Sequence, residues 1–253
     1  MRTRTVLSIL FAVACGGSSN GNPSSDASSA NDASSTSDAS AGGGSTIKIS
    51  GVATQLAVSG DPVPADGVLI AAYTNSDENT AVASAMTASD GSYTLTVPIA
   101  AGASLDGFLK ATKPGNATTY LYPPAPLSAD FAGAAINEIT TTTYSALSQF
   151  IGGGTATQGL IALEVVDSAS SLTPVAGAVV TSTPETPKAK TGYTGSSGLP
   201  DTSKTETTAD GRAFLFSLAP GAITVTATKP DATFKTTSLN VHANAFTTTL
   251  VTE

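Results

Sequence analysis

The sequence predicts an all-β protein with two tandem β-sandwiches of about seven strands each and a short helix at their junction. The first observation is an Asp210-Gly211 turn followed by apolar residues at every second position, the pattern of a half-buried strand. The second is an earlier copy of this pattern at Asp90-Gly91. The two Asp-Gly turns lie 120 residues apart, and two Thr-Lys-Pro turns lie 116 apart, so the chain contains a tandem repeat.

The turn chemistry predicts hairpins. Glycine supplies the positive φ that a tight turn needs, and aspartate can hydrogen-bond its own turn backbone. In the second copy, residues 219–221 (Ala-Pro-Gly) turn the chain again, and the residues from Ile223 to Thr228 alternate between apolar side chains and threonine. We therefore expect each Asp-Gly turn to close a hairpin, with a second hairpin following directly in the second copy.

The N-terminus predicts an export signal. Two arginines precede the short apolar run from Val6 to Ala14, which ends at Cys15. A membrane-spanning helix needs about 20 apolar residues, so this run is too short to be one and fits the apolar core of a signal peptide.

Residues 12–15 (Ala-Val-Ala-Cys), followed by Gly16, resemble the lipobox of bacterial lipoproteins, although Ala12 stands where leucine is commonest. The resemblance implies a signal peptide over residues 1–15, a diacylglyceryl group on Cys15 and, because Gly16 is not aspartate, delivery to the outer membrane. A lipid with more than one acyl chain anchors a protein stably. The alternative is an ordinary signal peptide with an unrelated cysteine. Cys15 is the only cysteine, so no disulfide is possible within the chain.

Residues 16–45 predict a disordered tether. They are mostly Ser, Ala, Gly, Asp and Asn and offer almost no apolar surface to bury. A flexible coil of this length would reach about 30 Å, which would separate the folded part of the chain from the membrane.

The first repeat covers residues 46–140 and reads as about seven short strands. Residues 141–158 follow as a junction segment. The run of four threonines at 140–143 offers an N-cap, apolar residues stand at 144, 147 and 151, and three glycines follow. These signals predict a two-turn helix whose apolar face packs on a sandwich.

The second repeat covers residues 159–253. Its main difference from the first is a Pro/Gly/Ser/Thr-rich segment over residues 183–204, which we expect to be a long loop. Loops of this length without secondary structure are uncommon and often functional.

Both repeats resemble carboxypeptidase regulatory-like (peptidase-associated, transthyretin-like) domains. The resemblance rests on the segment from Pro174 to Val180, on its looser counterpart from Pro62 to Ile70, on the Thr-x-x-Asp-Gly motif, and on the Leu-Ala-Pro-Gly strand of the second repeat. It implies a prealbumin-like Greek-key sandwich of about seven strands. In that family the domain is commonly an appendage to peptidases, receptors or surface proteins and has no catalytic residues of its own.

Charge and composition argue against several functions. Removal of the expected signal peptide takes away Arg2 and Arg4 and leaves 9 basic and 19 acidic residues. The chain therefore lacks the basic footprint of a nucleic-acid-binding protein. His242 is the only histidine, and its position out of phase with Leu239 and Val241 predicts an exposed ring. One histidine cannot supply a zinc site of several His/Glu ligands or a credible catalytic triad.

Two weaker possibilities remain at this stage. Several acidic residues of the first repeat could gather at one end and bind Ca²⁺, although turn formation explains them better; they are Asp61, Asp66, Asp77, Glu78 and Asp90. Carbohydrate binding usually needs exposed aromatic platforms, and the chain has no tryptophan. The candidate platform is Tyr193, because the other tyrosines considered, Tyr73, Tyr120 and Tyr122, are expected within strands.

The sequence thus predicts a non-enzymatic, lipid-anchored cell-envelope protein that serves as a binding or structural module, without a cofactor or metal. Its expected partners are the outer membrane, through the lipid, and a glycan or envelope protein. The alternative is an accessory module that recognises carbohydrate or peptide through residues 183–204, with Lys188, Lys190 and Tyr193 as ligand-contacting residues. An enzyme is the third possibility.

Overall fold

The computed structural model describes residues 44–253 except 57–60, 151–156 and 188. The expectations for the signal peptide, Cys15, most of the tether and Lys188 lie outside these residues. The described residues form eighteen strands and one helix, which confirms the all-β prediction. In each half of the chain, seven of the nine strands are three residues or longer.

The strands of the first half make the first sandwich. They are β1 (Ser45–Gln55), β2 (Val63–Pro64), β3 (Leu69–Thr74), β4 (Ala83–Met86), β5 (Ser92–Ile99), β6 (Gly107–Thr112), β7 (Thr118–Tyr122), β8 (Phe131–Ala132) and β9 (Ile136–Glu138). In one layer β1 pairs antiparallel with β2 and β5 and parallel with β8 and β9. In the other layer the strand order is β4-β3-β6-β7.

The strands of the second half make the second sandwich. They are β10 (Gly159–Val166), β11 (Val179–Thr183), β12 (Lys190–Thr194), β13 (Pro200–Asp201), β14 (Arg212–Leu218), β15 (Gly221–Lys229), β16 (Ala232–Thr233), β17 (Thr237–Val241) and β18 (Ala245–Thr252). Strand β10 lies between β14 and β18, and β15 lies between β11 and β17. These pairings repeat those of β1 with β5 and β9, and of β6 with β3 and β7.

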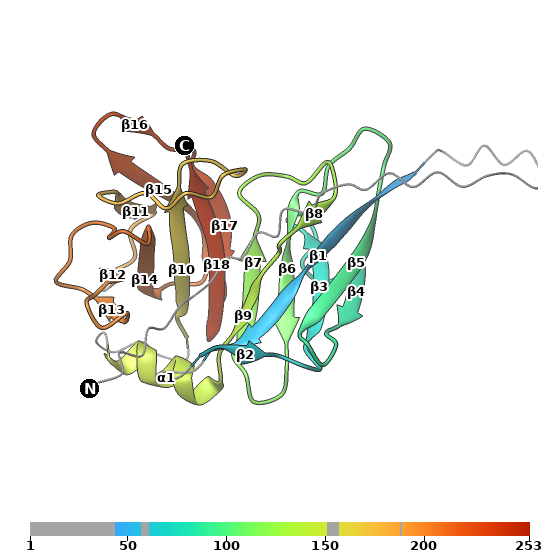
Figure 1. Cartoon of the computed structure of the whole chain (residues 1–253), viewed down its shortest axis with the longest axis horizontal. Coiled ribbons are helices and arrows are strands. Elements are labelled where there is room, and N and C mark those ends of the chain that lie inside the picture. Colours follow the sequence, from blue (N-terminus) through green and yellow to red (C-terminus); the bar gives the residue numbers. More distant parts are fainter. Residues whose placement is uncertain (1–43, 57–60, 151–156, 188) are drawn as a thin grey trace, which may run out of the picture.

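The two sandwiches share one sheet. Strand β18 pairs in parallel with β7, which produces a nine-stranded sheet of order β13-β12-β14-β10-β18-β7-β6-β3-β4 (Figure 1). The buried hydroxyls of Thr248 and Thr249 donate to the carbonyl oxygens of Tyr120 and Tyr122, so polar side chains in this strand are satisfied at the join.

The remaining layers cover opposite faces of this shared sheet. On β6 and β7, Leu109 and Leu121 belong to the core of the first sandwich, whereas Phe108, Tyr120 and Tyr122 belong to the core of the second. Successive residues of a strand point to opposite faces, so the two cores lie on opposite sides of the sheet.

The predicted helix is α1 (Thr141–Phe150), and its Thr140 side chain accepts a hydrogen bond from the backbone N–H of Thr143, as an N-cap does. Tyr144 packs in a third apolar cluster with Leu160, Phe214 and Phe246, so the helix covers part of the second sandwich. This placement confirms the predicted packing. No helix among the described residues is long and apolar enough to cross a membrane.

The predicted hairpins are wrong. Strand β4 pairs with β3 whereas β5 pairs with β1, so the Asp90-Gly91 turn carries the chain from one sheet to the other. Likewise β14 and β15 belong to different sheets. A tight turn between alternating segments predicts a hairpin only when both segments bury the same face of one sheet, and here each segment faces the core from its own layer.

Both turn glycines are held against the first strand of their own sandwich. Gly91 has φ +78° and Gly211 has φ +65°, and an added Cβ would meet the carbonyl oxygen of Ala53 at 2.3 Å or of Val165 at 2.5 Å. The Ala53 N–H donates to the Gly91 carbonyl, and the Val165 N–H donates to the Gly211 carbonyl, each at 2.8 Å. Glycine is therefore required for close backbone approach as well as for positive φ.

A buried threonine before each Asp-Gly turn forms two hydrogen bonds with the backbone of the segment that leads into β11 or β3. The Thr207 hydroxyl donates to the Val175 carbonyl at 2.7 Å and accepts from the Ala178 N–H at 2.9 Å. Thr87 makes the same two bonds, to the Ala65 carbonyl at 2.6 Å and from the Val68 N–H at 2.9 Å. The threonine of the Thr-x-x-Asp-Gly motif is thus a structural residue in both repeats.

We expect Thr207→Val to lower the free energy of unfolding by about 1–3 kcal/mol, because valine keeps the shape but leaves two buried backbone groups without partners. Thr207→Ser should retain most of the stability. Urea denaturation would measure both, with the exposed strand residue Thr94 changed to valine as the control. Equal midpoints for the two valine variants would contradict this role.

The expected long loop over residues 183–204 contains two strands. Strand β12 pairs with β14, and β13 pairs with β12, so this segment extends the shared sheet at one edge. In the first sandwich the corresponding edge strand, β4, pairs in the other layer with β3. The prediction of a structureless loop was therefore wrong, because hydroxyl-rich segments can pair when a sheet edge is available.

Candidate functional site at the junction of the two sandwiches

Four aromatic side chains gather where the sandwiches meet. Tyr73 on β3, Phe108 on β6, and Tyr120 and Tyr122 on β7 project from the same face of the shared sheet. With His242, from the turn between β17 and β18, they form what we call the junction cluster. Sequence alternation placed these tyrosines within strands, but it did not show that their outer face would be covered.

Phe108 is the centre of the junction cluster. Its ring centroid lies 5.5 Å from that of Tyr73, 5.7 Å from that of Tyr120 and 5.0 Å from that of Tyr122. The Phe108 side chain is almost fully buried. Offset aromatic contacts at these distances add stability beyond the burial of area, so they stabilise the face on which the core of the second sandwich packs.

His242 is not exposed as the sequence predicted. Its ring stacks on Tyr120 with centroids 3.8 Å apart and an interplanar angle of 5°, and its side chain is 20% exposed. Strand β17 ends at Val241, so the alternation used for the prediction no longer applies at residue 242. The turn instead directs the ring onto the first sandwich.

Charged and polar groups surround His242. Its Nε2 lies 3.4 Å from the Tyr122 hydroxyl and 4.0 Å from a Glu78 carboxylate oxygen. Burial lowers the pKa of His242, the Glu78 carboxylate opposes this shift and the Lys110 ammonium adds to it. Stacked and partly desolvated, His242 is a packing residue whose neutral form is favoured.

The tyrosine hydroxyls of the cluster stay protonated. Burial raises the pKa of Tyr120 to about 12, with the Glu78 carboxylate adding to the shift, and burial also raises the pKa of Tyr122. The backbone of Asn240 opposes part of the rise in the pKa of Tyr122. Neither hydroxyl is poised to accept a proton from a substrate near neutral pH.

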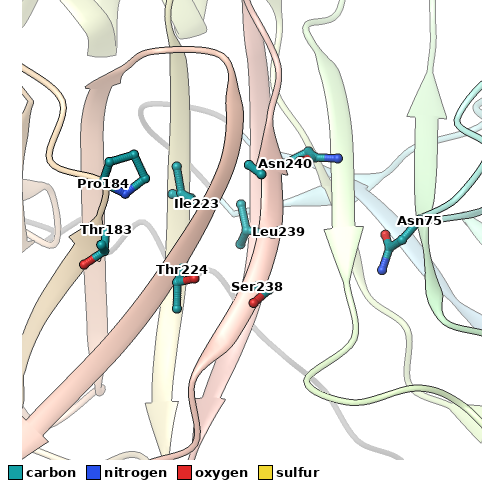
Figure 2. Close-up of a pocket in the computed structure, with 9 residues that line it drawn as sticks. Asn75, Thr183, Pro184, Ile223, Thr224, Ser238, Leu239 and Asn240 are labelled. Atoms are coloured by element: carbon teal, nitrogen blue, oxygen red, sulfur yellow. The ribbon is translucent and has the colours of Figure 1, made fainter.

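A cleft runs beside the junction cluster between the two sandwiches. One hollow of about 340 Å³ is lined by residues of β15, β17 and the end of β11, with Asn75 of the first sandwich on its other side (Figure 2). A second hollow of about 280 Å³ is lined by Thr236–Ser238 and by the Tyr122–Pro126 segment. Both include Asn75 and Ser238, so we treat them as one junction cleft.

The lining of the junction cleft is mainly neutral and combines apolar surface with a few polar groups. The Asn75 side chain donates to Asp106 Oδ1 at 2.8 Å, which fixes the acid at the cleft wall. Hydroxyls of Thr183, Thr224 and Ser238 also line the cleft. Among the described lining residues, Asp106 is the one charged side chain.

Of the three predicted ligand residues, the structure describes Lys190 and Tyr193. Tyr193 is only 2% exposed, and its hydroxyl accepts a hydrogen bond from the Val180 N–H at 3.0 Å, so it cannot act as the exposed platform that we expected. Lys190 is exposed at the start of β12. Thr183 and Pro184, at the other end of this segment, line the junction cleft.

The acidic residues of the first sandwich act in turns. Asp77 accepts hydrogen bonds from the backbone of Asn79 and Thr80, and Asp90 accepts one from the backbone of Ser92. In the part of the chain that the structure describes, no three His, Cys, Asp or Glu side chains lie where they could hold a metal ion.

Two further carboxyl groups are buried away from the junction cleft. Glu138 accepts a hydrogen bond from Asn116 at 2.8 Å, and burial raises its pKa. Glu164 lies with one oxygen 3.8 Å from Arg212 Nε, and burial raises its pKa to about 7 against the attraction of Arg212. Sequence patterns gave no sign of either, because both acids stand inside strands that otherwise read as apolar or alternating.

Comparison with known proteins gives no family. No family model matches the chain, and no curated protein matches it. Among solved structures, shaft pilin SpaA from Lactobacillus rhamnosus GG is 15% identical, with 82% of this chain and 98% of that chain covered and a TM-score of 0.25. The minor pilin GBS52 from Streptococcus agalactiae is 14% identical, with 82% and 96% covered and a TM-score of 0.28.

The Bacillus anthracis TIE protein is 14% identical at a TM-score of 0.26, and the match covers 81% of this chain but only 34% of that protein. At such TM-scores, the assignment of an all-β sandwich fold rests on the strand pairing of this chain itself.

Proposed function

We propose that the protein is a non-enzymatic module of the cell envelope that holds two β-sandwiches as one rigid unit, anchored through a lipid on Cys15 at the outer membrane. The observation that carries the proposal is the shared nine-stranded sheet, in which β7 and β18 join the sandwiches directly. The junction cluster covers this join on one face. A rigid pair of sandwiches suits a spacer or a scaffold that presents a binding surface at a fixed distance from a membrane.

The titratable groups support a non-enzymatic role. His242 is stacked on Tyr120 and the nearby tyrosine hydroxyls have raised pKa values, so the junction lacks a poised base. Glu164 is covered and paired with Arg212, so a substrate would not reach it easily. These groups are arranged for packing and not for proton transfer.

We also propose that each sandwich is a carboxypeptidase regulatory-like domain of the prealbumin-like type. Both repeats place the threonine and the glycine of the Thr-x-x-Asp-Gly motif in equivalent structural positions. A second candidate function, recognition of carbohydrate or peptide with help from residues 183–204, is favoured by one observation: Thr183 and Pro184 line the junction cleft.

The lipid anchor has a direct test. When the full-length chain is expressed in a Gram-negative host, we expect it to incorporate an alkyne-tagged palmitate and to fractionate with the outer membrane. Cys15→Ser should abolish the label and release the protein from the membrane, because Cys15 is the only thiol in the chain. Ser18→Cys combined with Cys15→Ser, which restores a thiol at the wrong position, is the control and should remain unlabelled. Equal labelling of wild type and Cys15→Ser would contradict the anchor.

A further inference from the structure

The junction cleft has walls that the fold holds in place. One wall comes from β15 and β17 of the second sandwich, and Asn75 of the first sandwich lies on the other side (Figure 2). Asp106 of the first sandwich also lines the cleft. The ladder between β7 and β18 fixes these walls relative to each other. A site of this kind needs little reorganisation when a ligand enters, which favours binding.

The size of the cleft suits a short chain-like ligand. Its two hollows have volumes of about 340 Å³ and 280 Å³, and they share Asn75 and Ser238. Small-molecule sites are typically about 300–1,000 Å³ and occur preferentially at domain interfaces. The cleft is therefore large enough for a ligand that extends from one hollow into the other.

The lining chemistry favours a neutral ligand with many hydroxyl groups. An anionic ligand would meet the Asp106 carboxyl without a lysine or arginine among the described residues that line the cleft. The side chains of Thr224 and Ser238 line the cleft from the exterior side of their sheet, where each can both donate and accept. Asn75 and Asp106 provide an amide and an acceptor on the facing wall.

The same residues fit a sugar better than an extended peptide. A peptide that added as a strand would pair with the edge of β17, whereas the cleft lies over the face of this sheet, where the paired residues Thr224 of β15 and Ser238 of β17 line it. The proline rings of Pro184 and Pro124 line the cleft and offer apolar C–H surface to the faces of sugar rings.

We propose that the junction cleft is a binding site for a neutral oligosaccharide whose hydroxyl groups hydrogen-bond with Asn75, Asp106, Thr224 and Ser238, Asp106 acting as an acceptor. The proposal rests on the binding role suggested above and places the site between the sandwiches, where only the first residues of segment 183–204 take part. Tyr193 and Lys190 are not needed for it.

The test uses the full-length protein in detergent and a panel of short neutral oligosaccharides built from glucose, mannose, galactose or N-acetylglucosamine. Saturation-transfer NMR identifies a bound member, and calorimetric titration measures its affinity. Ser238→Tyr would fill the cleft from an exposed strand position and should weaken binding by about tenfold or more. Asn75→Ala should also weaken oligosaccharide binding. Thr94→Tyr, at an exposed position on β5 away from the cleft, is the matched control and should bind like wild type.

The absence of binding by any neutral oligosaccharide would overturn the proposal, as would equal loss in Ser238→Tyr and Thr94→Tyr. If an extended peptide bound to the cleft and no oligosaccharide did, the cleft would be assigned to the peptide alternative. These outcomes are independent of Cys15 acylation, so a failure here is distinguishable from a failure of the envelope anchor.

Discussion

Replacing Phe108 with alanine is expected to lower the free energy of unfolding by about 3–5 kcal/mol, the usual cost of removing a buried phenylalanine ring. The side chain is 1% exposed and contacts the rings of Tyr73, Tyr120 and Tyr122. Because it lies in the first sandwich but packs in the core of the second, its loss should also weaken the coupling between the two.

The neighbouring residue provides a matched control. Leu109 is on the same strand but faces the core of the first sandwich, and Leu109→Ala should cost about 2–5 kcal/mol without disturbing the junction. Hydrogen exchange separates the two variants. Phe108→Ala should expose amides of β7, β17 and β18, whereas Leu109→Ala should expose those of β3, β6 and β7.

The distance between two spin labels measures directly how rigidly the two sandwiches are held relative to each other. Cysteines introduced at Thr94 on β5 and Thr228 on β15, in a Cys15→Ser background, place one label on each sandwich. We expect a narrow distance distribution in the otherwise unchanged protein and a broader one when Phe108 is replaced. A distribution that is already broad before the replacement would contradict the rigid unit on which the proposed function depends.

The sequence predicted the parts of this fold that depend on local chemistry. The Asp90-Gly91 and Asp210-Gly211 turns exist, the helix begins within the predicted run of threonines with Thr140 as its cap, and both halves repeat one set of pairings. Each of these features is determined by residues close together in the chain or by comparison of one half with the other.

The features that the sequence did not reveal depend on contacts between distant residues. The parallel pairing of β7 with β18 joins segments more than 120 residues apart. Strand β18 contains Thr247, Thr248 and Thr249, and such a polar run does not predict a strand that is buried on both faces. The hydroxyls of Thr248 and Thr249 can be buried because β7 supplies carbonyl acceptors. His242 and the junction cleft were missed for the same reason, since both exist only where the sandwiches meet.

Glu164→Gln is expected to make the free energy of unfolding less dependent on pH between about pH 5 and pH 8. Burial raises the pKa of Glu164 from 4.5 to about 7, although Arg212 Nε lies 3.8 Å away and opposes the shift. The side chain is only 9% exposed, so solvent screens it weakly. Below about pH 4.5 the carboxyl is neutral in the folded and unfolded chains, and it does not disfavour folding.

As the pH rises, the unfolded chain releases this proton first and the folded chain retains it until about pH 7. The free energy of unfolding therefore falls across this interval, and a pKa difference of this size corresponds to about 3 kcal/mol by pH 8. Glutamine keeps the shape and cannot ionise, so the variant should lose this part of the decline. Relative to wild type it should gain stability as the pH rises.

Urea denaturation of both proteins at pH 5 and pH 8 measures the difference. The rise in the pKa of Glu138, which is also buried, acts equally in both proteins and cancels in the comparison. Glu206→Gln, at an exposed position before the Asp210 turn, is the control for loss of one negative charge and should follow wild type. If the stability difference between Glu164→Gln and wild type stayed constant from pH 5 to pH 8, Arg212 would hold Glu164 ionised throughout, and the pair would act as an ordinary salt bridge of the second sandwich.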